Sequence, residues 1–396
     1  MSHRTVRDAA AGITVLAVAN FVAITTEVLP VGLLPQLAAG LGVPESTAGL
    51  LVSVYAFVVA ACAVPLTLAT RRLPRKPLLL ATVVVYAVAN VVAALAPSFG
   101  VVVAARTLGG VGHAVFFSVS IAYAARLVSP LYTGRSVTLV TAGGTAGFVL
   151  GVPLSTSLGA AVGWRWSFAV LAAVCALTAV LLGRVLPPVD AAPAAASTEQ
   201  RGGRGRLALV VGTNTLLFVG QYTVYTYVSL LMLATGLAAA SVGPALLVFG
   251  ALGIVGLWAA GRYLDRRPRT LTLVTIAVMV AALAGVALAL PQRATVLVGL
   301  AVWLAAFGAV PAAFQTLALR ARGASEDLAG AFVNGTSNLG IGLGAALGSV
   351  LVAGPGLPAL AWAGAGAMAV GGGIVLVARR AFPHDPTAAP RNDPEP

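Results

Sequence analysis

Residues 13–35 read ITVLAVANFVAITTEVLPVGLLP, and Glu27 is the only charged side chain in this run. A run of about 20 apolar residues is long enough to cross the hydrocarbon core of a bilayer as an α-helix. Similar runs follow at 47–70, 77–97, 99–127, 135–160, 165–187, 206–234, 240–262, 270–290, 295–319, 327–352 and 357–379. The sequence therefore predicts an all-α integral membrane protein with twelve transmembrane helices.

The composition supports a bilayer environment. Hydrophobic residues make up 59% of the chain and charged residues only 9%, which is too few to cover the surface of a soluble protein. The two cysteines, Cys62 and Cys175, both fall within predicted spans, so we expect neither a disulfide framework nor a metal site.

The basic residues are distributed unevenly along the chain. Arg106 lies deep within a span, Arg165 and Arg293 fall in or beside loops on one face, and the remaining 21 of the 24 (24 − 3) fall in the tails, the linker and the alternate loops or at the span ends beside them. Because basic loops stay in the cytoplasm, we expect both termini there, in a bacterial cytoplasmic membrane. The net charge of +13 thus reflects topology, and without a soluble basic domain we expect no nucleic-acid partner.

The chain divides into two similar halves. We expect a cytoplasmic tail at 1–12, a six-helix bundle at 13–187, a linker at 188–205, a second six-helix bundle at 206–380 and a disordered tail at 381–396. Such internal duplication is typical of transporters.

Two features recur at a nearly constant offset. The basic pair Arg71–Arg72 recurs as Arg266–Arg267, and a glycine ladder recurs after 197 residues. The ladder consists of Gly143, Gly147 and Gly151 in the fifth span and of Gly340, Gly344 and Gly348 in the eleventh. Glycines at this spacing let helices pack closely, and they can also let two halves rock. We expect Gly147, Gly151, Gly344 and Gly348 to lie at the interface between the halves.

Several motifs resemble those of the major facilitator superfamily, in particular its twelve-span drug:proton antiporter branch and the bacterial sugar efflux transporters within it. The motifs are Thr25 to Pro35 (TTEVLPVGLLP), the fourth-span set Arg106, Gly110, His113, Ala114, Phe116 and Phe117, and the fifth-span Gly151-Val152-Pro153-Leu154 followed by Gly163-Trp164-Arg165. The resemblance implies two pseudo-symmetric bundles, proton exchange, and a gating role for the fifth-span glycines and Pro153.

One family motif is incomplete. The loop between the second and third spans of the superfamily usually contains an Asp within a basic cluster, and Pro65 to Lys76 lacks it. The second half keeps the spacing with Gly261, Asp265, Arg266 and Arg269. The resemblance therefore assigns Asp265 and Arg266 to gating and implies a weakened clamp in the first half.

Three polar residues are candidates for proton coupling. Glu27 lies eight residues before the end of its predicted span, and Arg106 lies seven residues after the start of the fourth, which places both roughly 10–12 Å deep. We expect them to pair or to hydrogen-bond, because an isolated charge at that depth is costly. Glu27 can carry the coupling proton, contact substrate or form a structural ion pair, and Arg106 can couple protons or stabilise the fold. His113, two turns from Arg106, can pack, bind substrate or relay a proton to Glu27.

Uncharged polar and aromatic residues are candidates for substrate binding. In the seventh span they form one stripe, because i, i+4, i+7 and i+11 share a helix face. Such residues can also join helices. The candidates are Asn20, Tyr55, Phe117, Asn214, Phe218, Gln221, Tyr222, Tyr225, Asn334 and Asn338. A cavity of amides and phenols suits a small neutral molecule, such as a sugar or an amphipathic drug.

The sequence favours a proton-coupled exporter that works by alternating access, with protons as coupling ion, no cofactor and a monomeric state. An ATP-driven pump is disfavoured because the chain lacks a phosphate-binding Gly-x-x-x-x-Gly-Lys-Ser/Thr loop. A proton-independent facilitator or importer on the same fold is the alternative. We expect no enzyme, because paired carboxylates and nucleophilic sets are missing from the predicted loops. A membrane sensor would need a signalling domain.

Overall fold

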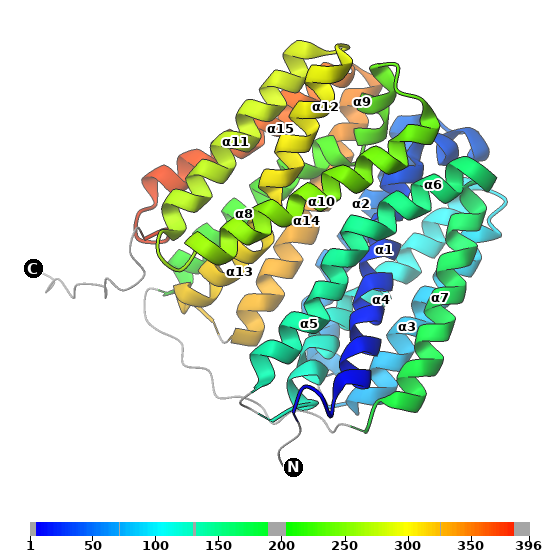
Figure 1. The fold of residues 1–396 in the computed structure, drawn as a ribbon, viewed down its shortest axis with the longest axis vertical. Helices are drawn as coiled ribbons and strands as arrows, with labels where there is room; N and C mark the ends of the chain where they lie inside the picture. The colour runs from blue at the N-terminus through cyan, green and yellow to red at the C-terminus, as the bar shows by residue number, and fades with distance from the viewer. Residues whose placement is uncertain (1–4, 71, 130–131, 189–202, 325, 384–396) are drawn as a thin grey trace, which may run out of the picture.

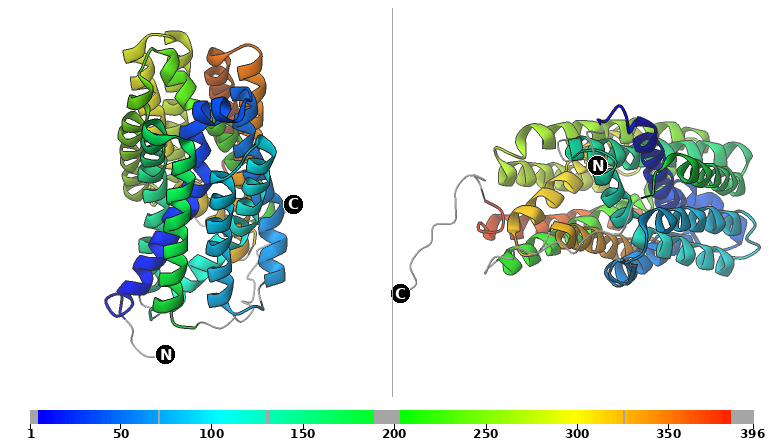
Figure 2. Two further views of the ribbon diagram at one scale, coloured as in Figure 1. Left: turned by 90° about the vertical axis from the view of Figure 1, so that its right-hand side faces the viewer. Right: turned by 90° about the horizontal axis from the view of Figure 1, so that it is seen from below.

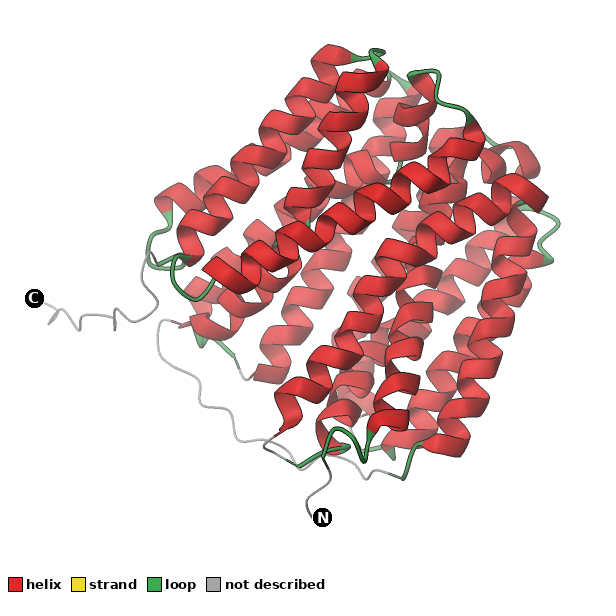
Figure 3. Ribbon diagram, in the orientation of Figure 1, coloured by secondary structure: helices red, strands yellow, loops and turns green. Residues whose placement is uncertain are grey.

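The computed structural model describes residues 5–70, 72–129, 132–188, 203–324 and 326–383. The predicted linker and C-terminal tail lie largely outside these ranges, and Arg71 lies outside them as well. Within the described ranges the regular structure is entirely helical (Figure 3).

Twelve helical stretches are long and apolar enough to span a membrane, which confirms the predicted fold class. The first six are α1 (Ala10–Leu41), α2 (Glu45–Thr70), α3 (Arg75–Ala94), α4 (Phe99–Arg126), the continuous α5 (Thr133–Ala146), η2 (Gly147–Gly151) and α6 (Val152–Val162), and α7 (Trp164–Val185). The last six are α8 (Gly203–Tyr225) with α9 (Val228–Ala234), α10 (Ala239–Tyr263), α11 (Pro268–Ala289), α12 (Arg293–Phe307) with α13 (Val310–Ala321), α14 (Glu326–Ala353) and α15 (Leu357–Val377).

The first six spans and the last six form two groups that stand side by side (Figure 1). We call residues 5–188 the first half and residues 203–383 the second half. The view from below in Figure 2 shows the same grouping. The halves meet where α14 packs on α2 and where α10 packs on α6 and η2. Both described ends of the chain lie on one side of the bundle, which we call the terminal side (Figure 1).

The halves are joined mainly on the side opposite the termini. A cluster there combines Leu34, Ala38 and Ala48 of the first half with Tyr227, Leu230 and Leu360 of the second. The Ser229 hydroxyl donates to the Val31 carbonyl over 3.4 Å. The Tyr227 hydroxyl, which donates over 3.1 Å to the Ala345 carbonyl of its own half, also lies 3.4 Å from the Ser46 carbonyl of the first half. The described structure is therefore closed on the side opposite the termini.

Three predicted spans are not continuous α-helices. In the fifth span, Pro153 has no N–H to donate to the Val149 carbonyl, and its ring crowds that carbonyl. The turn before Pro153 is accordingly the π-helix η2. In the tenth span, Pro311 leaves the Phe307 carbonyl without its helical donor, and the helix breaks at Gly308 and Ala309. The seventh span breaks between α8 and α9, which the predicted run at 206–234 did not indicate.

The first span is longer than its apolar run. Helix α1 extends from Ala10 to Leu41 and keeps two internal prolines, Pro30 and Pro35. Glu27 therefore lies near the middle of a 32-residue helix, deeper than the predicted span of 13–35 implied.

The glycines of both ladders face helices of their own half, although η2 itself packs on α10. The prediction that these glycines form the contact between the halves is therefore wrong. A Cβ on Gly147 would come within 2.6 Å of the Phe21 carbonyl of α1, and Gly143 and Gly151 face the same helix. In the second half, Gly340, Gly344 and Gly348 face α8 and the turn that follows it. A glycine ladder shows that another helix approaches closely, but its spacing does not identify that helix.

Other glycines occupy the interface between the halves. A Cβ on Gly243 of α10 would lie 3.0 Å from the Pro153 carbonyl, and one on Gly250 would lie 3.1 Å from Val149. On α14, a Cβ at Gly342 would lie 2.6 Å from the Phe57 ring of α2. Pro153 is thus at the interface through its carbonyl group.

We predict that Gly143→Ala destabilises the first half. Its Cβ would lie 2.0 Å from the carbonyl oxygen of Ala17, and backbone on a packed helix cannot move aside cheaply. We expect a loss of roughly 1–3 kcal/mol, the usual cost of overpacking, measured as thermal unfolding in detergent. Gly134→Ala is the control, since among the described residues no atom beyond its own helix and chain neighbours lies within 4 Å of the position that its Cβ would take. Equal unfolding temperatures for the two variants would contradict the packing assignment.

Candidate functional site

Three helices of the first half bring a carboxylate, an imidazole and a phenol into one buried chain. The Glu27 carboxylate of α1 lies 3.5 Å from Nε2 of His113 on α4. The other ring nitrogen of His113, Nδ1, lies 2.9 Å from the Tyr55 hydroxyl on α2. Glu27 is only 6% exposed, and the other two residues are fully enclosed. The structure thus places Glu27 beside His113, one of the predicted proton-coupling contacts.

Arg106 binds the backbone of α1. Its Nη1 and Nη2 donate to the carbonyls of Thr26 and Glu27 over 2.5 Å each, and its Nε donates to the Leu51 carbonyl over 3.2 Å. Pro30 explains the first bond, because proline cannot supply the helical N–H that the Thr26 carbonyl would otherwise accept.

Of the two expected arrangements, the structure therefore shows Arg106 in hydrogen bonding, to the Glu27 carbonyl, and not in an ion pair with the Glu27 carboxylate. Among the described residues, these two side chains form no ion pair within 4 Å. The guanidinium instead lies 4.0 Å from the centre of the Tyr55 ring, as a cation–π contact. Arg106 thus links α4 to the backbone of α1 beside Glu27 and to the backbone of α2.

Two buried asparagines join helices of the first half. Nδ2 of Asn20 donates to the Ser120 hydroxyl over 2.8 Å and to the Leu16 carbonyl over 2.9 Å. This placement makes Asn20, a predicted substrate residue, a link between α1 and α4. Asn90, which sequence reasoning missed, donates to the Thr26 hydroxyl over 3.0 Å. The feature of the sequence that could have indicated Asn90 is an amide side chain within the predicted span at 77–97.

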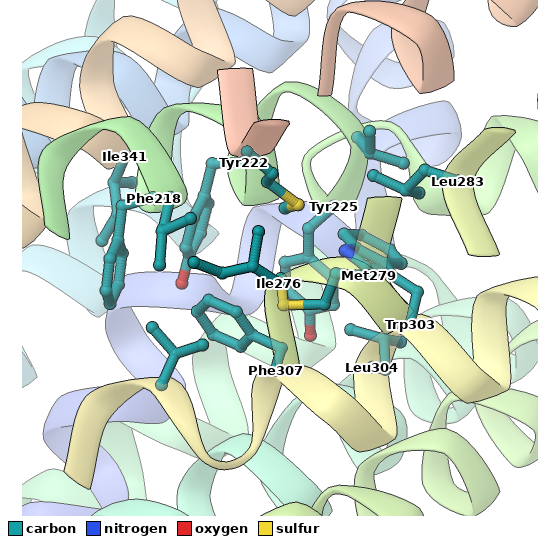
Figure 4. Close-up of a cluster of buried hydrophobic side chains, with 14 of the residues drawn as sticks. Phe218, Tyr222, Tyr225, Ile276, Met279, Leu283, Trp303, Leu304, Phe307 and Ile341 are labelled. Carbon is teal, nitrogen blue, oxygen red and sulfur yellow. The ribbon is translucent and has the colours of Figure 1, made fainter. Parts of the chain in front are cut away.

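Aromatic side chains form one wall of the second half (Figure 4). Phe218 stacks on Tyr222 with ring centres 6.2 Å apart, and Phe307 meets Phe218 edge-on at 5.4 Å. Trp303 meets Tyr225 at 6.5 Å. The structure thus brings together three predicted residues of the seventh span and adds Trp303 and Phe307 of α12. Those two were missed because the apolar run at 295–319 gives no sign of which face turns inward.

One aromatic pair crosses between the halves. Phe148 of η2 stacks on Tyr225 at the end of α8, with ring centres 5.1 Å apart and planes 19° apart. Phe148 was not a sequence candidate, because its direction depends on the π-helical turn. The pair lies at the point where the seventh span breaks, so it ties an irregular turn of one half to an irregular turn of the other.

The predicted amides of the second half fall into two classes. Nδ2 of Asn214 donates to the Ser337 hydroxyl over 2.8 Å, and Asn338 donates to the Asn334 carbonyl over 3.1 Å. These three residues make contacts within or between helices. Gln221 is completely buried, and neither its Nε2 nor its Oε1 has a hydrogen-bond partner among the described residues. Because a buried unpaired amide is costly, Gln221 is the amide best placed to receive a ligand.

Phe117 and the predicted gating charges complete the candidate set. The half-buried Phe117 packs against the His113 ring, with centres 4.9 Å apart.

Asp265 forms a salt bridge of 2.6 Å with Arg320 at the end of α13, although its side chain is 81% exposed. Arg266 beside it is exposed. Their gating role stays a prediction, and the Asp265 salt bridge lies within the second half.

Comparisons with known proteins show the family to which the chain belongs. The model of the Major Facilitator Superfamily matches residues 16–326. A probable sugar efflux transporter of Mannheimia succiniciproducens is 29% identical over 356 residues, covering 89% of this chain and 90% of that protein. A chloramphenicol efflux pump of Mycobacterium tuberculosis is 33% identical over 356 residues, covering 86% and 85%. An uncharacterised transporter of Bacillus subtilis is 34% identical, covering 91% and 93%.

Solved structures show the same fold at lower sequence identity. A bacterial homologue of the human lysosomal transporter Spinster matches with a TM-score of 0.76 at 14% identity, covering 94% of this chain and 97% of that one. A D-xylose–proton symporter matches with a TM-score of 0.74 at 17% identity, covering 95% and 98%. Together with the family match, these findings confirm the predicted superfamily and the expectation that the chain is not an enzyme. The chain belongs to the major facilitator superfamily and is a multi-pass membrane transporter of small molecules.

Proposed function

We propose that the protein is a proton-coupled secondary active exporter of a small neutral organic molecule, a sugar, a sugar analogue or an amphipathic drug. The observation that carries this proposal is the buried contact between Glu27 and His113 near the middle of α1. Ionisable side chains at membrane depth are costly, and they are retained mainly on ion and proton pathways. We place the protein in a bacterial cytoplasmic membrane, with both termini in the cytoplasm, on the distribution of its basic residues.

The contacts of Glu27 suit a group that gains and loses a proton. His113 can donate a hydrogen bond to the ionised carboxylate and can accept one from the protonated acid, because neutral imidazole has one donor and one acceptor nitrogen. No cation neutralises the carboxylate within ion-pair distance among the described residues. Changes in solvation during the transport cycle can therefore load and release the proton.

The second half supports the substrate class. The aromatic wall of Phe218, Tyr222, Tyr225, Trp303 and Phe307 offers apolar surface and phenolic hydroxyls, and Gln221 adds an amide with free donors and an acceptor. This combination suits a neutral amphipathic molecule and offers little to a dianion. The relatives named as sugar and chloramphenicol efflux proteins support the same range of substrates.

The closed side of the bundle fits one state of an alternating-access cycle. To open that side, the halves must break the contacts of Tyr227 and Ser229 and the stack of Phe148 on Tyr225. Rocking of two repeats about a central site is the usual motion of such folds. The proton on Glu27 would bias this motion.

Substrate identity can be tested by a growth screen. A strain expressing the protein is challenged with sugars, thiogalactosides and chloramphenicol-like drugs, beside a strain expressing Glu27→Gln. We expect raised tolerance or reduced accumulation of at least one compound with the wild-type chain alone. If vesicles containing the protein transport that compound at the same rate with and without a pH gradient, the facilitator alternative is favoured.

Paired substitutions separate substrate contacts from helix contacts. We predict that Gln221→Ala weakens substrate binding about tenfold, the effect of one lost hydrogen bond of roughly 1.4 kcal/mol, without lowering thermal stability. Asn214→Ala should instead lower stability, because Ser337 loses its partner. Binding and unfolding are measured on the same purified samples. Loss of stability in Gln221→Ala with unchanged affinity would show that Gln221 joins helices.

A further inference from the structure

Arginines from two distant segments gather at one corner of the second half. Residues 262–269 join the end of α10 to the start of α11, and residues 376–380 form the end of α15 and the turn after it. The two segments touch, because Nη2 of Arg269 donates to the Leu376 carbonyl over 2.6 Å. The ends of α10, α11 and α15 accordingly lie together on the terminal side (Figure 1). We call residues 262–269 and 376–380 the arginine corner.

The arginine corner carries far more positive than negative charge. Its exposed arginines are Arg262, Arg266, Arg267, Arg379 and Arg380. The one acid in these two segments, Asp265, is already bound by Arg320 over 2.6 Å. Among the described residues, none of the five exposed arginines has an acidic partner within 4 Å. Like charges gathered at one corner repel one another, so this arrangement is costly unless an anion binds there.

A sixth arginine of the corner is almost wholly buried. Arg269 is 4% exposed, and its Nε has no hydrogen-bond partner among the described residues. The bond to the Leu376 carbonyl satisfies one N–H group of the guanidinium, but a carbonyl does not neutralise the positive charge. In the described part of the chain, no acidic side chain lies within 4 Å of Arg269. Because a buried charge without a counter-charge is costly, Arg269 gives a second and independent reason to expect an anion.

Membrane topology explains why these residues are basic, but not why they gather. Basic loops keep one side of a membrane protein in the cytoplasm wherever on that side they lie. In the first half, exposed arginines on the terminal side are spread over four helix ends, at Arg7, Arg72, Arg135 and Arg184. In the second half the fold instead joins two basic segments whose contact, between Arg269 and Leu376, spans 107 residues of sequence.

The side chains next to the arginine corner suit a lipid. Trp258 is 63% exposed and lies one turn before Arg262 on the same face of α10, and Tyr263 is exposed as well. Leu376 and Val377 at the end of α15 are also exposed. Exposed Trp and Tyr side chains are typical of the headgroup level of a bilayer. A molecule that fits this surface therefore has an anionic group at headgroup depth and apolar chains below it.

We propose that the arginine corner binds the phosphate of an anionic phospholipid. Guanidinium groups bind phosphate oxygens through paired hydrogen bonds, and basic clusters beside a membrane span attract anionic headgroups. The bound lipid neutralises the repulsion between the two segments and joins the ends of α10, α11 and α15, so it stabilises the second half. This inference goes beyond the proposed function, because it depends neither on the substrate nor on proton coupling.

The test measures thermal unfolding of the purified full-length chain in detergent with added lipid. A ligand that binds the folded chain alone raises the unfolding temperature according to its concentration and affinity. We expect phosphatidylglycerol to raise this temperature at concentrations where phosphatidylcholine with the same acyl chains has no effect. Inorganic phosphate supplies a similar anion without the chains. Equal protection by phosphatidylcholine, or by inorganic phosphate at the same concentration, overturns the assignment to an anionic lipid.

Two pairs of substitutions test whether both segments bind the same headgroup. One pair is Arg266→Gln with Arg267→Gln, and the other is Arg379→Gln with Arg380→Gln. We expect each pair to weaken phosphatidylglycerol binding about tenfold, the equivalent of about 1.4 kcal/mol. All four substitutions together should weaken it clearly less than the roughly hundredfold that two independent sites would give, because contacts to one shared group are not additive.

The first half provides a matched control variant. Arg7→Gln, Arg72→Gln, Arg135→Gln and Arg184→Gln together remove four charges from the same side of the protein, but from four separate helix ends. This variant should keep nearly the full affinity for phosphatidylglycerol. Equal losses in the two fourfold variants, or a hundredfold loss in the corner variant, would overturn the shared site. If the pair at 266–267 fails to insert, the pair at 379–380 decides alone, and its unchanged affinity would also overturn the site.

Discussion

Glu27→Gln is expected to abolish transport driven by a pH gradient while the protein still folds and inserts. Glutamine keeps the size of the side chain and a hydrogen-bond partner for His113, but it cannot titrate. Substrate accumulation driven by a pH gradient should fall to the level seen in vesicles without the protein. Exchange of labelled for unlabelled substrate without a gradient should survive, because the site itself is intact.

Glu45→Gln is the matched control for this substitution. Glu45 is the exposed first residue of α2, on the side opposite the termini, and it touches none of the proton-site residues. It should keep the full response to the gradient. A Glu27→Gln protein that still responds to the gradient like the wild type removes Glu27 from the mechanism.

Arg106→Ala is expected to be the most destabilising single substitution in the first half. It leaves the Thr26 carbonyl without a donor, because Pro30 supplies none, and it removes the bonds to Glu27 and Leu51 as well. The unpaired Thr26 carbonyl costs roughly 1–3 kcal/mol and each of the other two bonds to the charged guanidinium about 1.5 kcal/mol, so the loss should be about 3 kcal/mol or more. Thermal unfolding of the solubilised protein and its yield in the membrane both measure it.

Pro30→Ala provides a specific rescue of that variant. Alanine at 30 restores the backbone N–H that the Thr26 carbonyl accepts in a regular helix. The double variant Arg106→Ala, Pro30→Ala should therefore recover part of the stability that Arg106→Ala loses. Pro35→Ala removes the other internal proline of α1. Arg106 does not contact the carbonyl that this proline leaves without a helical donor, so Pro35→Ala should give no rescue. Equal effects of the two alanines would contradict the carbonyl-binding role of Arg106.

The sequence was enough to predict the fold, because apolar runs of membrane length and the placement of basic residues report directly on the bilayer. It also singled out Glu27, since a lone carboxylate in a span stands out from its surroundings. Its neighbour His113 followed from the helical repeat with Arg106. These inferences depend on local patterns along the chain.

The partners of these residues could not be predicted from local patterns. Which helix faces a glycine ladder, and whether Arg106 meets a carboxylate or a carbonyl, depend on packing between distant segments. The direction of Phe148 depends on a π-helical turn that Pro153 favours but does not specify. For the same reason Asn90, Trp303 and Phe307 looked like ordinary residues of apolar or aromatic spans.

The central claim, that substrate export is coupled to proton entry at Glu27, is tested most directly by measuring both fluxes at once. Vesicles containing the purified protein are loaded with a substrate found in the growth screen and diluted into substrate-free buffer of the same pH, with a pH-sensitive dye inside. The account predicts that substrate leaving the vesicle drives protons inward, and that the dye signal is absent with Glu27→Gln. Substrate efflux from wild-type vesicles without any proton movement would contradict the account and identify a facilitator.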